Sequence, residues 1–352
     1  MPYSPNLPVV NNRYEAAYAD PKGEGDARPA ALDIIDDEGL VGKLSDKVAL
    51  VTGGTSGIGL EIVRALAKTG MTVFYTTRDV AKGQIVKKQL LGEDPKYKLE
   101  VVQIELGSLE SVKKAAEDFL MRAHRLDVLM LNAGVGAVPR AFTEDGFESQ
   151  FAINYLSHFY IFNLVKELLL ETSSTHKINV RVVATSSTSH TASTVLPENN
   201  YDSHNPRNRG YPDAGQTYGH THTAKIWLCN EIERLYGDKG VHAISLHPGG
   251  FTSGLMGTVE PKTREYLEKM IQMPHIQKVW MTVGQGAATN IIAAVGKDYD
   301  GLGGFYMENC GVSHPVPDDV VWAGHGFKSW AFDKEGEEKL WADSMKMVGL
   351  EA

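Results

Sequence analysis

The chain is long enough to bury a full hydrophobic core, and its charge balance is acidic. It has 352 residues, of which 42% are hydrophobic, so it is expected to fold as one large domain or two small ones and not to be disordered throughout. The formal net charge of −9 offers no basic surface for nucleic acid or anionic lipid, so small molecules or proteins are the expected partners.

Other compositional signals favour a cytoplasmic protein. No apolar run reaches the roughly 18 residues of a membrane span, because the longest candidate is broken by Lys166 and Glu167. The opening MPYSPNLPVV has three prolines and no basic segment, unlike a secretory signal. Cys229 and Cys310 lie in or beside apolar segments, which favours buried thiols in a reducing compartment, although a single bridge between them also fits.

Residues 1–45 differ from the rest of the chain in composition and in hydrophobic pattern. They are rich in Pro, Asn, Asp and Ala, and YADPKGEGDARPA has no apolar period. We therefore predict an irregular N-terminal extension, either an extended arm or a disordered lead-in. The stretch PAALDIIDDEGL predicts one short helix that docks on the body, which is expected to span residues 46–352.

Apolar runs of strand length alternate with amphipathic helical patterns through this main region. Such alternation is typical of a parallel sheet with helices on both faces, so it predicts a single doubly wound α/β domain of Rossmann type with seven parallel strands. The predicted strands cover residues 47–52, 72–77, 99–106, 127–132, 179–187, 241–247 and 303–308. The predicted helices cover residues 58–69, 79–91, 108–124, 144–172, 217–236 and 276–296.

The first strand runs into a glycine turn and then directly into a helix, in VALVTGGTSGIGLEIVRALAKTG. Gly53, Gly57 and Gly59 suit a tight turn that lets the main chain approach a pyrophosphate, while the helix N-terminus offers amides and a positive dipole end. With the strand before it and the helix after it, this turn is better interpreted as a dinucleotide site than as a merely structural turn.

The spacing of these glycines resembles the cofactor loop of short-chain dehydrogenases/reductases, and the resemblance covers residues 40–345. LNAG (131–134) is similar to that family's turn after the fourth strand, and FAINYLSHF (151–159) to its helix with the active-site asparagine. RVVATSSTSH (181–190) resembles the strand that ends in the catalytic serine, and HPGGFT (247–252) resembles the loop beside the nicotinamide. GQGAATNIIAAVG, GGFYMENC and EGEEKLWADSMKMVG are similar to the retinol dehydrogenase and WW-domain-containing oxidoreductase branch.

The resemblance implies roles for individual residues. Tyr218 is implied as the acid/base, Ser187 as the hydroxyl that polarises the substrate oxygen, and Asn154 as the anchor of a water in the proton relay. From the residues alone, Ser187 would equally fit a strand-end cap and Asn154 a core amide. Cofactor contacts are implied for Gly53, Thr55, Ser56, Gly57, Ile58, Gly59, Arg78, Asn132, Ala133, Gly134, Tyr218, His222, Pro248, Gly249 and Thr252.

The stretch YGHTHTAKIW departs from the family pattern, because His222 stands where the family has a lysine. That lysine brings the tyrosine pKa, about 10 in a free phenol, toward working pH and holds the ribose. His222 is one helical turn from Tyr218, so it is expected to reach the ribose and, when protonated, to lower the tyrosine pKa. Lys225 faces the same side but lies about 10.5 Å along the helix axis, which disfavours direct replacement.

The remaining histidines are expected to pack, not to bind metal. His220 and His222 point about 200° apart on a helix, so no metal site is predicted. His158 and His247 are interpreted as packing residues, and His190, just past Ser187, as a packing residue or a substrate contact.

Cofactor preference depends on FYTTRDV. Asp79 lies at the distance past the glycines where an acidic residue binds the ribose of NAD(H). At the strand end, however, Thr76 and Thr77 occupy the usual carboxylate positions and Arg78 follows, as in family members that hold the 2′-phosphate of NADP. We therefore predict NADP(H).

The substrate pocket is expected in residues 135–140, 188–215 and 253–280, which follow the fourth, fifth and sixth strands. Apolar side chains in the third segment predict a hydrophobic carbonyl or alcohol, such as a polycyclic or polyketide-like secondary metabolite. They are Leu255, Met256, Tyr266, Met270, Ile271, Met273 and Trp280.

Three functional hypotheses remain open. The first is an NADP(H)-dependent oxidoreductase acting on a hydrophobic ketone or secondary alcohol. The second is a non-redox enzyme of this fold, an isomerase, cyclase, dehydratase or epimerase, that uses Tyr218 and His222 as an acid/base pair. The third is a nucleotide-sensing or scaffold protein. The resemblance also implies a homodimer or homotetramer through the helices at 144–172 and 217–236.

Overall fold

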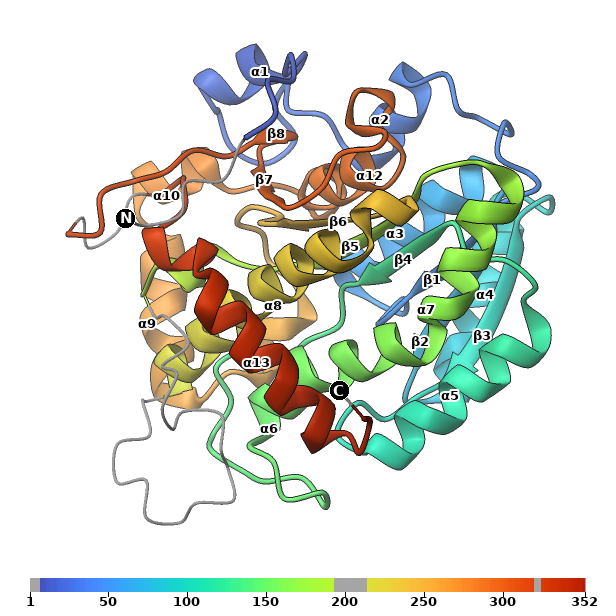
Figure 1. Cartoon of the computed structure of the whole chain (residues 1–352). Coiled ribbons are helices and arrows are strands. Elements are labelled where there is room, and N and C mark those ends of the chain that lie inside the picture. The colour runs from blue at the N-terminus through green and yellow to red at the C-terminus, as the bar shows by residue number, and fades with distance from the viewer. Residues whose placement is uncertain (1–6, 193–213, 320–323, 352) are drawn as a thin grey trace.

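Eight strands form one sheet in the order β3-β2-β1-β4-β5-β6-β7-β8 in the computed structural model, which describes residues 7–192, 214–319 and 324–351 (Figure 1). Strands β1 to β7 are parallel to their neighbours, and β8 pairs antiparallel with β7. The strands are β1 (Val48–Val51), β2 (Thr72–Thr77), β3 (Lys98–Gln103), β4 (Val128–Leu131), β5 (Val180–Thr185), β6 (Val241–Leu246), β7 (Phe305–Glu308) and β8 (Gly311–Val312).

The Rossmann-type α/β fold is confirmed, but the predicted number of seven strands is wrong. The eighth strand has only two residues, Gly311 and Val312, which is too short for a hydrophobic period to be recognised in the sequence. It follows β7 through a tight turn in which Asn309 and Cys310 have positive φ angles of 52° and 58°.

Helices cover both faces of this sheet (Figure 1). They are α1 (Glu15–Ala19), α2 (Ala31–Asp37), α3 (Gly57–Lys68), α4 (Val80–Glu93), α5 (Leu109–Arg122), α6 (Ser149–Phe151), α7 (Ser157–His176), α8 (Ala214–Tyr236), α9 (Pro261–Ile271), α10 (Pro274–Val279), α11 (Val283–Gly286), α12 (Ala288–Val295) and α13 (Lys334–Met347). In the described part of the chain, none of these helices is both long and apolar enough to cross a bilayer.

Two apolar clusters hold these layers together. Successive strand residues point to opposite faces, so Leu50 joins the cluster under α5, α7, α8 and α13, whereas Ala49 and Val51 join the cluster under α2, α3 and α12. Every residue of β4, β5 and β6 is buried, which explains their nearly continuous apolar sequence.

Two of the predicted helices are interrupted. The helix predicted for residues 144–172 contains a five-residue π-helix, Ala152–Leu156, between α6 and α7. The helix predicted for 276–296 is divided into α10, α11 and α12, because Trp280 and Thr282 are extended and Thr282 caps α11 together with Gln285. Both interruptions lie at the edge of the sheet where the candidate site forms.

Helices near both ends of the described chain pack on the body of the fold. The short helix predicted near residue 30 is present as α2, and Ile34 and Ile35 are fully buried beside α12 and α3. At the other end, α13 lies along α8 (Figure 1), and its Trp341 ring packs against Phe159 and Phe162 of α7.

Candidate active site

The turn between β1 and α3 is packed so closely that side chains do not fit at its glycines Gly53 and Gly59. Gly53 has a φ of +73°, and a Cβ there would lie 3.0 Å from the Cβ of Ala133. A Cβ on Gly59 would lie 2.0 Å from the carbonyl oxygen of Gly53. The turn therefore keeps a bare backbone at the start of α3, where Ser56 and Gly57 open the helix, and this cradle fits the phosphates of a dinucleotide.

Threonine hydroxyls tie this turn to the neighbouring strand ends. The Thr52 hydroxyl accepts hydrogen bonds from the backbone N–H groups of Asn132 and Ala133 at 2.9 and 3.0 Å. The Thr76 hydroxyl accepts one from the Gly53 N–H at 3.1 Å. The Asn132 amide donates to the Thr52 carbonyl at 3.1 Å, and its Oδ1 is buried without a partner among the described residues. That oxygen remains available to a ligand in this cradle.

At the end of β2, the Asp79 carboxylate caps the N-terminus of the helix that follows, α4. Asp79 accepts a hydrogen bond from the Lys82 N–H at 3.1 Å and so caps α4. Thr76 and Thr77 are buried, whereas Arg78 is exposed at the rim of the cradle. The positive charge beside the cradle therefore comes from Arg78, while Asp79 is committed to the helix cap.

Ser187 and Tyr218 meet after β5 and at the start of α8. The Ser187 hydroxyl donates to Ser189 Oγ at 3.2 Å, and its oxygen accepts from the Ser189 N–H at 3.1 Å. Desolvation by burial raises the pKa of Tyr218 to about 12, and a side-chain hydrogen bond with Ser187 partly opposes this rise. The Tyr218 phenol is therefore protonated at neutral pH.

Asn154 lies inside the π-helix and joins three segments. Its Oδ1 accepts from the Val135 N–H at 2.8 Å. Its Nδ2 donates to the Val135 carbonyl at 3.2 Å and to the Thr221 hydroxyl at 3.1 Å. The Asn154 carbonyl faces His158 Nδ1 at 2.9 Å, and His158 Nε2 lies 3.1 Å from the Thr52 hydroxyl. Asn154 thus links the turn after β4 to α8, one helical turn from Tyr218.

The structure places the His222 ring directly beside the phenol. The two ring centres are 4.3 Å apart, with an angle of 64° between the planes. His222 is 5% exposed, and neither ring nitrogen has a partner in the described part of the chain. Burial first, then the charge of Lys225 and nearby histidines, lower the pKa of His222 well below 6.5. In its neutral form this imidazole lacks the positive charge that would lower the pKa of Tyr218.

Lys225 provides a buried amine that donates to backbone carbonyls. It is 1% exposed, and its Nζ donates to the carbonyl oxygens of Ala133 at 3.2 Å and Thr185 at 3.1 Å. Burial lowers the pKa of Lys225 to about 7. Lys225 therefore joins the ends of β4 and β5. The sequence predicted that Lys225 faces the same side of the helix as Tyr218, but it did not reveal the two carbonyls.

The loop after β6 is held by the segment that follows α10. The Trp280 indole N–H donates to the Thr252 hydroxyl at 3.1 Å, and the Met281 N–H donates to the Gly250 carbonyl at 2.8 Å. Gly249 has a φ of +93°, and Pro248 before it is buried. The sequence suggested Trp280 only as a residue lining an apolar pocket, so its link to Thr252 was missed.

The candidate residues gather at the carboxyl ends of β1, β2, β4, β5 and β6. A cavity of about 700 Å³ lies at the other side of the sheet, where the strands begin, and it is lined by residues such as Lys47, Arg181 and Gly240. None of the candidate site residues lines that cavity. Part of the expected specificity segment, 193–213, lies outside the described residues, so its predicted role stays a prediction.

Comparison with known proteins identifies close relatives of this chain. A family model described as short chain dehydrogenase matches residues 47–194. The chain is 43% identical over 341 residues to the short-chain dehydrogenase/reductase prx1 of Penicillium rubens, covering 97% of this chain and 96% of that protein. It is 40% identical over 350 residues to the oxidoreductase calI of Penicillium decumbens, covering 97% and 99%. A WW domain-containing oxidoreductase of Pongo abelii is 28% identical over 348 residues, covering 98% and 75%.

Solved structures share the fold. A crystal structure of an uncharacterized protein from Mycobacterium paratuberculosis superposes with a TM-score of 0.62 and 25% identity, covering 87% of this chain and 94% of that one. The RhlG/NADP active-site complex of Pseudomonas aeruginosa superposes with a TM-score of 0.57 and 22% identity, covering 76% and 96%.

Proposed function

The chain belongs to the short-chain dehydrogenase/reductase family, and from this premise we propose that it is an NADP(H)-dependent oxidoreductase acting on a hydrophobic ketone or secondary alcohol. The observation that carries the proposal is the pairing of the Ser187 and Tyr218 hydroxyls at the sheet edge that also bears the glycine turn. Bound NADPH would supply the hydride in such a reaction.

The binding of the cofactor is proposed from the shape and charge of the cradle. The turn from Gly53 to Gly59, including Thr55, Ser56 and Ile58, would hold the phosphates at the start of α3. Arg78 would hold the 2′-phosphate, because its guanidinium is exposed while Asp79 caps α4. Asn132, Ala133 and Gly134 would lie beside the adenine, and Pro248, Gly249 and Thr252 beside the nicotinamide.

Tyr218 is proposed as the proton donor. Its phenol, with a pKa raised to about 12 by burial, is in the protonated form that a carbonyl oxygen needs as it gains negative charge. Ser187 would hydrogen-bond the same oxygen. Reduction of a ketone needs this protonated phenol, whereas oxidation of an alcohol needs the phenolate.

His222 is proposed as a contact of the nicotinamide ribose. Buried polar atoms in proteins rarely lack a partner, and both nitrogens of this ring lack one among the described residues. Since its pKa is lowered well below 6.5, any histidine limb in the pH profile is expected at correspondingly acidic pH. The substrate, predicted to be a hydrophobic secondary metabolite, would enter beside Ser187 and Tyr218.

The first test is Tyr218→Phe. We expect NADPH-dependent reduction of hydrophobic ketones to fall by about 10²–10⁴-fold in kcat, the usual contribution of a general acid, with NADPH binding retained. Tyr97→Phe, a change in the turn before β3 and away from the site, is the matched control. Full turnover in Tyr218→Phe would contradict the proposal.

The second test is His222→Lys, which restores the residue type that the family has at this position. An added ammonium beside the phenol is expected to lower the Tyr218 pKa and to preserve or raise kcat. His220→Lys, two residues away on another face of α8, serves as the control. A clear loss of rate only at position 222 would show that the histidine has a required role of its own.

One observation favours a second candidate function. A neutral imidazole packed on a phenol at 4.3 Å is also suited to remove a proton beside a carbonyl, as in an isomerase, cyclase, dehydratase or epimerase. Product formation without any change in nicotinamide absorbance would identify this activity and exclude net redox turnover.

A further inference from the structure

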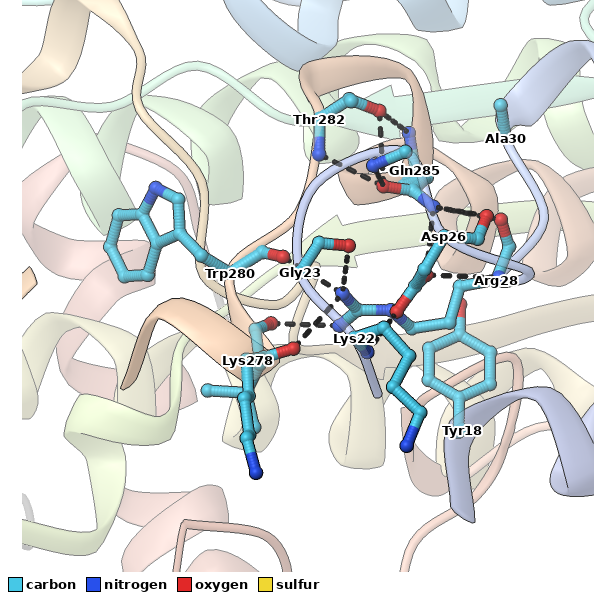
Figure 2. Close-up of polar contacts among 12 residues, drawn as sticks. Tyr18, Lys22, Gly23, Asp26, Arg28, Ala30, Lys278, Trp280, Thr282 and Gln285 are labelled. Carbon is cyan, nitrogen blue, oxygen red and sulfur yellow. Dashed lines mark hydrogen bonds and ion pairs between the residues drawn. The ribbon is translucent and has the colours of Figure 1, made fainter. Parts of the chain in front are cut away.

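The N-terminal arm, defined here as residues 7–45, is fastened to the end of α10 by one buried arginine (Figure 2). Arg28 is 5% exposed. Its guanidinium donates to the carbonyl oxygens of Val279 at 2.7 Å and Trp280 at 2.8 Å, with a longer contact to Lys278 at 3.5 Å. A rigid, planar donor group that bonds consecutive carbonyls fixes the path of that backbone.

Gln285 of α11 also binds the arm, through hydrogen bonds to its backbone (Figure 2). Its amide nitrogen donates to the carbonyl oxygens of Asp26 at 3.2 Å and Arg28 at 2.9 Å, and its Oε1 accepts from the Gly25 N–H at 3.1 Å. The Asp26 carboxylate accepts from Arg28 Nε at 2.8 Å. The arm and the segment before α11 are therefore joined by buried, mutually satisfied polar groups, which resist rearrangement.

Trp280 and Met281, which follow α10, pack directly against the loop after β6. A Cβ on Gly250 would lie 2.9 Å from the Trp280 ring, and a Cβ on Gly249 would lie 1.7 Å from the Met281 methyl carbon. Together with the hydrogen bond from the Met281 N–H to the Gly250 carbonyl at 2.8 Å, these contacts leave the loop no room to move separately.

The Trp280 indole also sets the direction of the Thr252 hydroxyl. The indole nitrogen is a donor only, so at 3.1 Å the Thr252 oxygen accepts and its own hydrogen is left to donate elsewhere. Thr252 is exposed at the rim of the site. An oriented donor at this position matches the carboxamide oxygen of a nicotinamide.

We propose that Arg28 is a positioning residue for the nicotinamide end of the cofactor: it fixes Trp280, and Trp280 holds the Thr252 hydroxyl as a donor toward the carboxamide. The inference rests on the proposed function, because it presupposes NADP(H) in the cradle. It gives the arm a role in binding the cofactor although Arg28 and Thr252 are far apart in sequence.

The test compares two nucleotides. NADPH and 2′-phospho-ADP-ribose share every part except the dihydronicotinamide ring, so a loss confined to NADPH reports on the contacts of that ring. For Arg28→Met we expect the NADPH dissociation constant to rise about tenfold, the equivalent of one oriented hydrogen bond, and that of 2′-phospho-ADP-ribose to stay within about twofold. Arg13→Met, which removes another arginine of the arm that pairs with Glu38, should leave both constants unchanged.

Trp280→Phe provides a second variant that does not disturb the buried joint. It keeps a ring over Gly250 but removes the indole N–H, so it should reproduce the selective loss of NADPH affinity without lowering the thermal unfolding midpoint. In the double variant with Arg28→Met, the two losses should not multiply, because both act through the same Thr252 hydroxyl.

Two results would overturn the inference alone: equal loss of both nucleotides in Arg28→Met, or losses that multiply in the double variant. A wild-type chain that binds neither nucleotide would overturn the proposed function itself, and the inference with it.

Discussion

Lys225 shows how one side chain at the site acquires a role that residue spacing does not reveal. The sequence placed it on the same face of α8 as Tyr218, and the structure puts its amine against the carbonyls of Ala133 and Thr185. These acceptors come from two different strand ends, so their proximity depends on the assembled sheet. The same holds for Asn154, whose partners Val135 and Thr221 lie in separate segments.

Lys225 also predicts a pH-dependent stability. Its folded pKa of about 7 lies below the unfolded value of about 10.4, because burial penalises the ammonium. Between these values the unfolded chain binds a proton that the folded chain does not, so the unfolding free energy rises with pH by up to about 1.4 kcal/mol per pH unit. Below pH 7 both states are protonated and this contribution is constant.

Chemical unfolding of the wild type and Lys225→Met at pH 6 and pH 9 measures this effect. At pH 9 the variant should be less stable by about 1–3 kcal/mol, since two buried carbonyls lose their donor. At pH 6 this difference in unfolding free energy between wild type and variant should become smaller or change sign. For Lys113→Met, on the exposed side of α5, the difference in unfolding free energy from the wild type should be the same at both pH values. A difference for Lys225→Met that does not change with pH would contradict the prediction.

At the scale of elements, the sequence identified the strands best where apolar runs end at turns. All seven strands from β1 to β7 were anticipated, because strands of a parallel sheet that is covered on both faces require runs of apolar residues. The π-helix at 152–156 was not, because an i to i+5 bond leaves no mark on the hydrophobic period. The breaks beside Trp280 lie where this segment contacts the arm, and Arg28 of the arm is 252 positions away in the sequence.

The turn between β1 and α3 carries a prediction at this scale. In Gly59→Ala the new methyl group would meet the Gly53 carbonyl oxygen at 2.0 Å, so the turn must open, at a cost of about 1–3 kcal/mol. We expect a lower unfolding midpoint and loss of NADPH binding. Both can be measured by thermal unfolding with and without the nucleotide.

Gly92→Ala in α4 is the matched control for that change. A Cβ there meets nothing within 4 Å, and the residue lies in a helix. It should be neutral or stabilise the protein by up to about 1 kcal/mol. If Gly59→Ala bound NADPH as the wild type does, the turn would not be the phosphate cradle.

For the whole molecule, the C-terminal helix affects the expected association. Trp341 packs on Phe159 and Phe162, and Asn230 of α8 donates to Glu337 at 2.7 Å. Parts of α7 and α8, the helices through which a homodimer or homotetramer was expected by resemblance, are thus covered by the chain's own α13.

We therefore expect the wild type to sediment as a monomer of 38.5 kDa. Deleting residues 334–352 should uncover the apolar side chains of α7 and α8 and shift the chain to larger species, because exposed apolar patches of this kind drive association. Light scattering over a range of concentrations tests both expectations. A wild-type dimer at micromolar concentration would show that another surface mediates assembly.

The arm has a final consequence for how the protein is made. Asn12 donates to Asn309 and Arg28 to Trp280, and these acceptors are synthesised 297 and 252 residues after their donors. At about 5–20 residues per second, the arm waits many seconds for its acceptors. During that time Ile34 and Ile35, fully buried in the finished fold, have no mature surface to cover, so the newborn chain presents them to chaperones and proteases until translation passes α12 and β8.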